Sequence, residues 1–193
     1  MSISKRMVAG LALALVSTAA AADTVSWSGP YAGLSYAAND GTNAYDPSSP
    51  MDDDSYNLLG ESHSLFGGYN WGNGPWVYGA ELAINRGSVH ERSSDGTDYP
   101  GYKFDTMFDL KARVGYALGK TLVYGTLGYS SGEFTYNGTD HYQSTGCLYG
   151  IGADYKVGSR YFVGAELTRR ELSNSHPIDS MINTLSVRFG MSF

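Results

Sequence analysis

Ile182-Asn-Thr-Leu-Ser-Val-Arg-Phe-Gly-Met-Ser-Phe193 is the stretch of sequence that decides the fold. Large apolar side chains occupy every second position in its second half, and small or polar residues lie between them. Successive side chains of a β-strand point to opposite faces of a sheet, so this period of two predicts a strand with one apolar face. The alternating apolar residues are Leu185, Val187, Phe189, Met191 and Phe193.

The beginning of the chain has the pattern of a secretory signal peptide. Lys5 and Arg6 precede an apolar run from Met7 to Val16, and three alanines ending at Ala22 supply small residues before a cleavage site. The apolar run is about half the roughly 20 residues that a membrane-spanning helix needs, so a retained anchor is the weaker alternative. We therefore expect residues 1–22 to be a cleaved signal peptide and residues 23–193 to form one domain.

Composition excludes several classes of protein. The formal net charge is −6, and removal of Lys5 and Arg6 makes the chain more acidic, which argues against nucleic acid as a partner. The single Cys147 can form no internal disulfide and is most simply a small apolar residue. After the leader no apolar run is long enough for a membrane helix. A membrane β-barrel stays open, because only every second residue of its strands faces lipid.

Eight segments alternate in this way, and each is near or above the 9–11 residues that cross a bilayer at a tilt. They are residues 27–38, 61–71, 76–89, 103–117, 121–136, 142–156, 160–172 and 182–193. In the fourth segment the alternation places Phe104 and Phe108 outward, and Lys103 and Asp105 inward. The facing of the fifth segment is ambiguous.

The connections between these segments alternate in length. Short turns are expected at residues 72–75, 118–120 and 157–159, and long polar loops at residues 39–60, 90–102, 137–141 and 173–181. This layout is typical of an outer-membrane barrel with both termini on the periplasmic side. Aromatic residues near the short turns are expected to form a girdle at the membrane interface, namely Trp27, Trp71, Trp76, Tyr116 and Tyr155.

The charged residues decide between two kinds of eight-stranded barrel. A soluble lipocalin-like barrel directs its apolar face inward, whereas here the charged face has to be the narrow interior. The pattern therefore predicts an all-β fold: an eight-stranded antiparallel transmembrane up-and-down β-barrel, preceded by a cleavable signal peptide.

Several short motifs carry a family resemblance, and their order and spacing are more specific than any one of them. They are Trp27–Gly33, Gly67–Asn70, Tyr78–Glu81, Arg113–Ala117, Gly150–Tyr155 and the final Phe193. Together they resemble the small porin-family outer-membrane barrels, a group that includes opacity-type surface proteins and is similar in fold to the transmembrane domain of OmpA. The resemblance covers essentially the whole chain after the leader. It does not extend to the peptidoglycan-binding domain of full OmpA proteins.

The resemblance implies a location and partners. It places the chain in the cell outer membrane as a monomer, among outer-membrane lipid and lipopolysaccharide. It also implies that the last strand, with Leu185, Val187, Phe189, Met191 and Phe193, is the signal that the barrel-assembly machinery reads during biogenesis.

The inward charges are the candidate functional residues. They comprise Glu81, Asp109, Lys111, Arg113, Asp154, Glu166 and Arg188, together with Asp105 and Arg170. Because an eight-stranded barrel is only wide enough for its own side chains, and buried charges have to be paired, we expect them to form a salt-bridged plug. The alternative, implied by the resemblance to OmpA, is a gate in which Glu81, Arg113, Asp154 and Glu166 exchange partners and open a narrow ion path.

Other chemistry is disfavoured. His63 adjoins Ser64, but neighbours in a strand face opposite sides and cannot act as a pair. Asp52, Asp53 and Asp54, with Asp40 and Asp46 before them, lack the order of a calcium-binding loop. No catalytic, cofactor-binding or metal-binding residues are expected, and none of the four histidines, His176 included, has a suitable partner.

We therefore expect a non-enzymatic integral outer-membrane protein that contributes to envelope structure and presents four surface loops. Two alternatives stay open: a narrow, low-conductance porin, and an adhesin-type protein whose loops bind haem or a host factor. The loop sequences identify no ligand.

Overall fold

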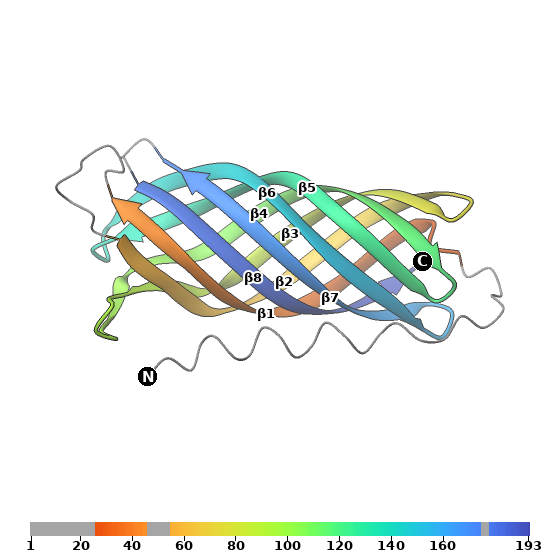
Figure 1. Ribbon diagram of the computed structural model, residues 1–193, viewed down its shortest axis with the longest axis horizontal. Helices are drawn as coiled ribbons and strands as arrows, with labels where there is room; N and C mark the ends of the chain where they lie inside the picture. Colours follow the sequence, from red (N-terminus) through yellow and green to blue (C-terminus); the bar gives the residue numbers. More distant parts are fainter. Residues whose placement is uncertain (1–25, 46–54, 175–177) are drawn as a thin grey trace.

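The computed structural model describes residues 26–45, 55–174 and 178–193, which form eight β-strands (Figure 1). The strands are β1 (Gly29–Tyr45), β2 (Ser55–Asn73), β3 (Trp76–Arg92), β4 (Asp98–Leu118), β5 (Thr121–Tyr136), β6 (Asp140–Val157), β7 (Tyr161–Ser173) and β8 (Ile178–Ser192). Within those ranges no helix has the length and apolar character of a membrane span. Several residues named in the sequence analysis lie outside these ranges. They are the expected signal peptide, Asp46, the three consecutive residues Asp52, Asp53 and Asp54, and His176.

The strands close into one barrel. Each pairs antiparallel with its neighbours in the sequence, and β8 returns to pair with β1 from Tyr31↔Ser192 to Tyr45↔Ile178. The strands run at a slant around the barrel (Figure 1). The predicted fold, an eight-stranded antiparallel up-and-down barrel, is confirmed.

The two ends of the barrel differ. The turn end, on the right in Figure 1, carries the connections β2–β3, β4–β5 and β6–β7, together with the start of β1 and the end of β8. Gly74, Gly119 and Gly158 have φ of 60°, 63° and 85° in these turns, a conformation that glycine adopts without the penalty of a Cβ. The opposite end, which carries the other four connections, is called the loop end below.

The strands extend further toward the loop end than the sequence predicted. β1 continues to Tyr45 instead of Ala38, and β2 begins at Ser55 instead of Glu61. The apolar alternation disappears in these extensions because several inward positions, such as Asn39 and Asn43, are polar yet buried. The long loops expected at residues 39–60 and 90–102 are thus largely strand in the described residues.

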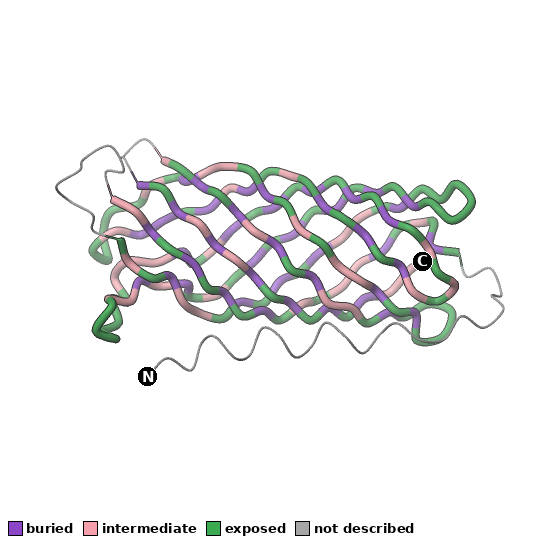
Figure 2. The backbone as a smooth tube through the Cα atoms, viewed as in Figure 1, coloured by how far each residue is buried: buried purple, intermediate pink, exposed green. Residues whose placement is uncertain are grey.

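The barrel is apolar outside and polar inside along its middle. Leu185, Val187 and Phe189 are 40%, 60% and 54% exposed, whereas Arg113 and Glu166 are 3% and 4% exposed. Buried and exposed residues alternate along every strand (Figure 2). This sidedness is the one that a lipid-facing barrel requires and is opposite to that of a soluble barrel.

One part of the predicted facing is wrong. The register of β4 against β5 shifts between Phe104 and Met107, where a β-bulge adds one residue to β4. A bulge reverses the facing of the residues beyond it, so Phe104 points into the barrel and Asp105 lies outside. Asp105 therefore does not belong to the inward charges.

Two apolar clusters fill the interior. The turn-end cluster consists of Trp27, Tyr31, Phe66, Val77, Ala83, Leu122, Tyr124 and Phe162. The loop-end cluster consists of Leu58, Val89, Phe104, Met107, Phe134, Leu172, Ile178 and Ile182. Eight buried charged residues lie in the stretch of lumen between these clusters: Glu81, Asp109, Lys111, Arg113, Asp154, Glu166, Arg170 and Arg188.

Candidate functional site

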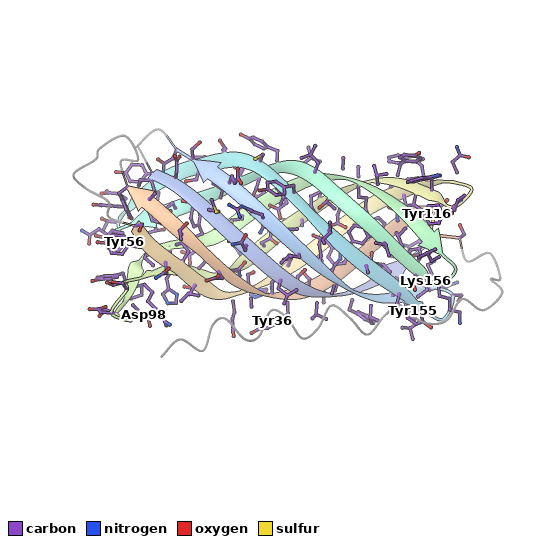
Figure 3. All side chains as sticks on the ribbon, viewed as in Figure 1. Tyr36, Tyr56, Asp98, Tyr116, Tyr155 and Lys156 are labelled. Carbon is purple, nitrogen blue, oxygen red and sulfur yellow. The ribbon has the colours of Figure 1, made fainter. Side chains whose placement is uncertain are left out.

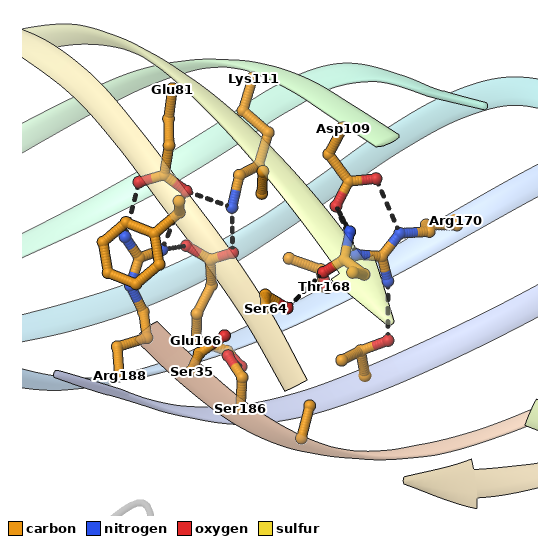
Figure 4. Close-up of a pocket in the computed structure, with 15 residues that line it drawn as sticks. Ser35, Ser64, Glu81, Asp109, Lys111, Glu166, Thr168, Arg170, Ser186 and Arg188 are labelled. Carbon is orange, nitrogen blue, oxygen red and sulfur yellow. Dashed lines mark hydrogen bonds and ion pairs between the residues drawn. The ribbon is translucent and has the colours of Figure 1, made fainter. Parts of the chain in front are cut away.

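The structure brings the seven predicted inward charges together inside the lumen. Glu81, Asp109, Lys111, Arg113, Asp154, Glu166 and Arg188 are all buried. They come from five strands (β3, β4, β6, β7 and β8), and Figure 4 shows the part of this network around Glu81 and Asp109. Each sits at an alternate position of a strand whose other face is apolar, which is why the fold directs it inward.

Glu81 and Glu166 share two cations. Lys111 Nζ lies 2.6 Å from Glu81 Oε1 and 2.7 Å from Glu166 Oε1. Arg188 donates to both carboxylates as well, with its Nη2 2.5 Å from Glu81 Oε2 and its Nη1 bonded to Glu166 Oε2. This square of two acids and two bases is the centre of the network.

Arg113 and Asp154 link the square to the turn-end cluster. Arg113 Nη2 donates to Asp154 Oδ2 at 2.9 Å, and the guanidinium carbon lies 3.8 Å from the centroid of the Tyr124 ring. Tyr31 donates to Glu81 at 2.9 Å, and Tyr124 donates to Glu166 at 3.0 Å. These two tyrosines were not predicted as site residues, although both occupy inward positions.

A second group lies nearer the loop end. Arg170 donates two hydrogen bonds to Asp109, from Nε at 3.1 Å and from Nη2 at 2.6 Å. Ser130 and Asn85 complete the shell of Asp109 with donors at 2.7 and 2.8 Å. Asn85 and Ser130 are neutral residues, so no charge pattern in the sequence pointed to them.

The network is balanced in charge and leaves little free space. Four carboxylates (Glu81, Asp109, Asp154, Glu166) face four cations (Lys111, Arg113, Arg170, Arg188). The cavity among these residues has a volume of about 20 Å³, room for about one water molecule. An apolar cluster lies on either side of this ionic layer.

Four of the five predicted girdle residues lie on the outer surface, and one does not. Trp71, Trp76, Tyr116 and Tyr155 are exposed near the turn end, where Figure 3 labels the two tyrosines. The assignment of Trp27 to the girdle is wrong. It is 6% exposed, packs against Phe162 inside the barrel, and donates from Nε1 to the carbonyl of Gly119. Residues 26–28 precede β1, so strand alternation does not govern their facing.

The last strand presents the apolar face predicted for the assembly signal. Leu185, Val187, Phe189 and Phe193 are exposed, and Met191 is partly buried. The aromatic ring of Phe189 stacks on Tyr161 of the neighbouring strand, with 6.0 Å between ring centroids.

The described residues do not form a hydrolytic triad around a histidine. His141 Nδ1 faces both Glu133 Oε1, at 3.2 Å, and Thr135 Oγ1, at 3.4 Å. In a catalytic triad the acid lies on one ring nitrogen of the histidine and the nucleophile on the other, and His141 does not have that arrangement. His63 is exposed whereas Ser64 is buried, which confirms that they face opposite sides. No group of three potential metal ligands occurs among residues 26–45, 55–174 and 178–193.

Comparison with known proteins gives matches along most of the chain. A family model described as "Outer membrane protein beta-barrel domain" matches residues 9–193. The 31 kDa outer-membrane immunogenic proteins of Brucella melitensis biotype 1 and Brucella suis biovar 1 are each 28% identical over 209 residues, spanning 91% of this chain and 87% of the relative.

Solved structures of small barrels share the fold. Neisserial surface protein A aligns with a TM-score of 0.56 at 15% identity, covering 86% of this chain and 98% of its own. Ail, the attachment invasion locus protein of Yersinia pestis, aligns with a TM-score of 0.53 at 16% identity, covering 86% and 99%.

Proposed function

Because the chain belongs to the family of outer-membrane protein β-barrel domains, we propose that it is a non-catalytic, non-conducting barrel that holds a rigid loop-end surface above the outer membrane. Its location in the cell outer membrane follows from the family. Export by the signal peptide at residues 1–22, insertion by the barrel-assembly machinery, contact with lipopolysaccharide and a monomeric state are parts of the same proposal.

The filled lumen is the observation that carries the proposal. An ionic layer in which four acids face four bases lies between two apolar clusters. An ion that crosses the barrel would therefore have to displace the side chains of both clusters. The non-catalytic part is supported by the His141 geometry, in which acid and hydroxyl meet the same nitrogen.

Single-channel recording in planar bilayers tests the filled lumen. We expect no ion current from the purified barrel at salt concentrations where a known porin conducts. The same porin, recorded under the same conditions, serves as the positive control. Regular current steps from the unaltered protein would contradict the proposal.

The narrow porin is the second candidate, favoured by the shared partners in the network. Lys111 and Arg188 each contact both Glu81 and Glu166, so either cation can leave one carboxylate while keeping the other. If steps are seen, Glu81→Gln and Arg113→Gln should change their conductance. Unchanged conductance in both variants would exclude the network as a gate.

Presentation of the loop end is tested by labelling intact cells. Ser94 lies in the β3–β4 connection at the loop end, and Asn73 lies at the opposite end beside the β2–β3 turn. In a Cys147→Ser background, a membrane-impermeant maleimide should label Ser94→Cys but not Asn73→Cys. Labelling of Asn73→Cys alone would show that the barrel is inserted in the other direction.

A further inference from the structure

A ring of tyrosines lines the inner face of the barrel at the loop end. We call Tyr45, Tyr56, Tyr99, Tyr102 and Tyr136 the tyrosine collar. Their ring centroids lie 4.9–6.5 Å apart in a closed sequence of edge-to-face contacts. Tyr56 is labelled at this end in Figure 3. The collar stands above the loop-end cluster, whose Phe134 precedes Tyr136 by two residues on the same face of β5.

Glu91 belongs to the same inner face. It is the register partner of Tyr99, and Asn43 is the register partner of Tyr56. The side chain of Glu91 is buried, at 2% exposure. Asn43 Nδ2 donates to Glu91 Oε1 at 2.6 Å, and the Tyr45 hydroxyl donates to the same oxygen at 2.5 Å. Both of these hydrogen bonds end on Oε1, and both donors are neutral groups.

This carboxylate differs from every other buried carboxylate that the structure describes. Glu81, Asp109, Asp154 and Glu166 each have an Arg or Lys partner, whereas no Lys, Arg or His of the described residues pairs with Glu91. The nearest candidates on its own strand are engaged elsewhere, since Arg92 and His90 both pair with Asp98. Burying a charge without a counter-charge costs free energy. The presence of the unpaired Glu91 carboxylate at the loop end therefore requires a reason.

The site lies outside the membrane-spanning part of the barrel. The outward apolar residues of β3 end at Ile84, and exposed Arg86 and Ser88 follow before Glu91 is reached. Burial raises the pKa of the Glu91 carboxyl, while the hydrogen bonds from Tyr45 and Asn43 act in the opposite direction. No cation contributes to that pKa, in agreement with the geometry.

We propose that the tyrosine collar and Glu91 form a binding site for a small alkylammonium group. The electron-rich faces of aromatic rings attract cations, and rings of this kind are the usual receptor for quaternary ammonium. Glu91 supplies the counter-charge, the apolar floor excludes water, and the negative net charge of the chain draws cations toward the barrel. The ligand thereby becomes the partner that Glu91 lacks.

A purely structural collar would make a different prediction. If the tyrosines only cap the loop-end cluster, a neutral residue at position 91 would support them as well as Glu91 does. Any binding of a small solute to the collar would then not depend on the charge of the solute. Charge dependence is therefore the discriminating property. This site is independent of the closed lumen, so its failure would leave the proposed barrel function standing.

The test uses the full barrel refolded in a non-ionic detergent, because zwitterionic detergents contain a quaternary ammonium group. Choline, butylamine and the neutral choline analogue 3,3-dimethylbutanol are titrated separately by calorimetry or by NMR of the tyrosine rings. We expect saturable binding of an ammonium and none of the neutral alcohol. Tighter binding of choline than of butylamine would identify a quaternary ligand, and the reverse order a primary amine such as a lysine side chain.

Variants assign the binding to the site. Glu91→Gln keeps the size and hydrogen-bonding capacity of the side chain and should weaken binding at least about tenfold, as should Tyr102→Leu. Tyr149→Leu, on the outer face of β6, is the matched control and should leave the affinity unchanged. Each variant is checked for folding by its gel mobility before and after boiling. Equal affinity of Glu91→Gln and the unaltered chain, or no binding of either ammonium at millimolar concentration, would overturn the proposal.

Discussion

At the scale of single residues, two aspartates of β4 are predicted to differ sharply in their contribution to stability. Asp109 is buried and holds Arg170, Ser130 and Asn85, so Asp109→Ala leaves the Arg170 guanidinium buried without its acid. Loss of one partner of a buried pair costs about 3–5 kcal/mol. Unfolding of the refolded barrel in urea should register a loss of that size.

Asp105 provides the control for this measurement. It pairs only with Lys103, at 3.0 Å, and about half of its side chain is exposed. Exposed pairs contribute about 0–1 kcal/mol, so Asp105→Ala should change the free energy of unfolding by no more than that. Similar losses in the two variants would mean that Asp105 faces inward after all and that the β-bulge is misplaced.

Glu91 should make stability depend on pH in an unusual direction. Its pKa is raised above the ordinary 4.5, so the folded chain retains a proton that the unfolded chain has released. Below pH 4.5 both states are protonated and the effect vanishes. As the pH rises from there through the folded pKa, this group should lower the free energy of unfolding.

The difference between the unaltered chain and Glu91→Gln isolates this contribution. The stability of the variant relative to the unaltered chain should increase between pH 4 and pH 7, as measured by urea unfolding at each pH. A constant difference across that range would show that the carboxyl titrates normally. Binding residues often lower the stability of the folded state, so replacing one of them is expected to raise the free energy of unfolding.

At the scale of strands, inward glycines make room for the rings that fill the turn-end half of the lumen. A Cβ at Gly152 would lie 2.4 Å from the Tyr124 ring, and a Cβ at Gly190 would lie 2.2 Å from the ring of Phe162. Since Tyr124 also stacks on Arg113, Gly152→Ala should displace both and cost about 1–3 kcal/mol in urea unfolding.

Gly125, on neighbouring β5, is the matched position. A Cβ there would meet nothing closer than the carbonyl of Gly150 at 3.9 Å, which is an ordinary contact. Gly125→Ala should therefore be neutral or slightly stabilising, because alanine loses less conformational entropy on folding. If both variants unfold alike, the close approach of the Tyr124 ring does not matter.

The depth of the lipid belt can be measured on β8. Val187 lies in the exposed apolar row, whereas Asn183, on the same face and nearer the loop end, lies beyond it. In bilayers, Val187→Lys should lower the free energy of unfolding by about 2–4 kcal/mol and Asn183→Lys by about 0–1 kcal/mol. Equal losses at the two positions would place the edge of the belt above Asn183.

How far the sequence predicted this structure depends on the part of each strand. Where apolar and polar residues alternate strictly, as in β8 and the turn-end half of β3, the facing of the side chains was predictable because one property separates the two faces. The bulge in β4 was not, since a residue added to one strand leaves the local alternation intact on each side of it. Trp27 was misplaced because it lies before the first strand and is held by tertiary contacts with Phe162.

The candidate sites divide in the same way. The lumen charges were found because a charged residue in an otherwise apolar strand is conspicuous. The collar was missed because Tyr56, Tyr99 and Glu91 lie in segments that the sequence predicted as loops, where facing has no meaning. Only closure of the barrel brings β1, β2, β4 and β5 together at the loop end.

At the scale of the whole molecule, closure should make the barrel resistant to detergent. Every strand is paired on both sides, so sodium dodecyl sulfate at room temperature has no free strand from which to begin unfolding. The refolded protein should migrate differently on a gel before and after boiling. Identical migration, with recovery from the soluble periplasm, would contradict a membrane barrel.

The strand extensions at the loop end have an evolutionary consequence. Their interior is held by alternate residues such as Leu58 and Val89, while the residues between them, such as Glu61 and Ser88, lie exposed on the outer face. Outward positions of this kind can therefore mutate without disturbing the interior packing. Under selection by antibodies or bacteriophages, point substitutions alone could change the exposed surface of the loop end, with no insertion, deletion or change of fold.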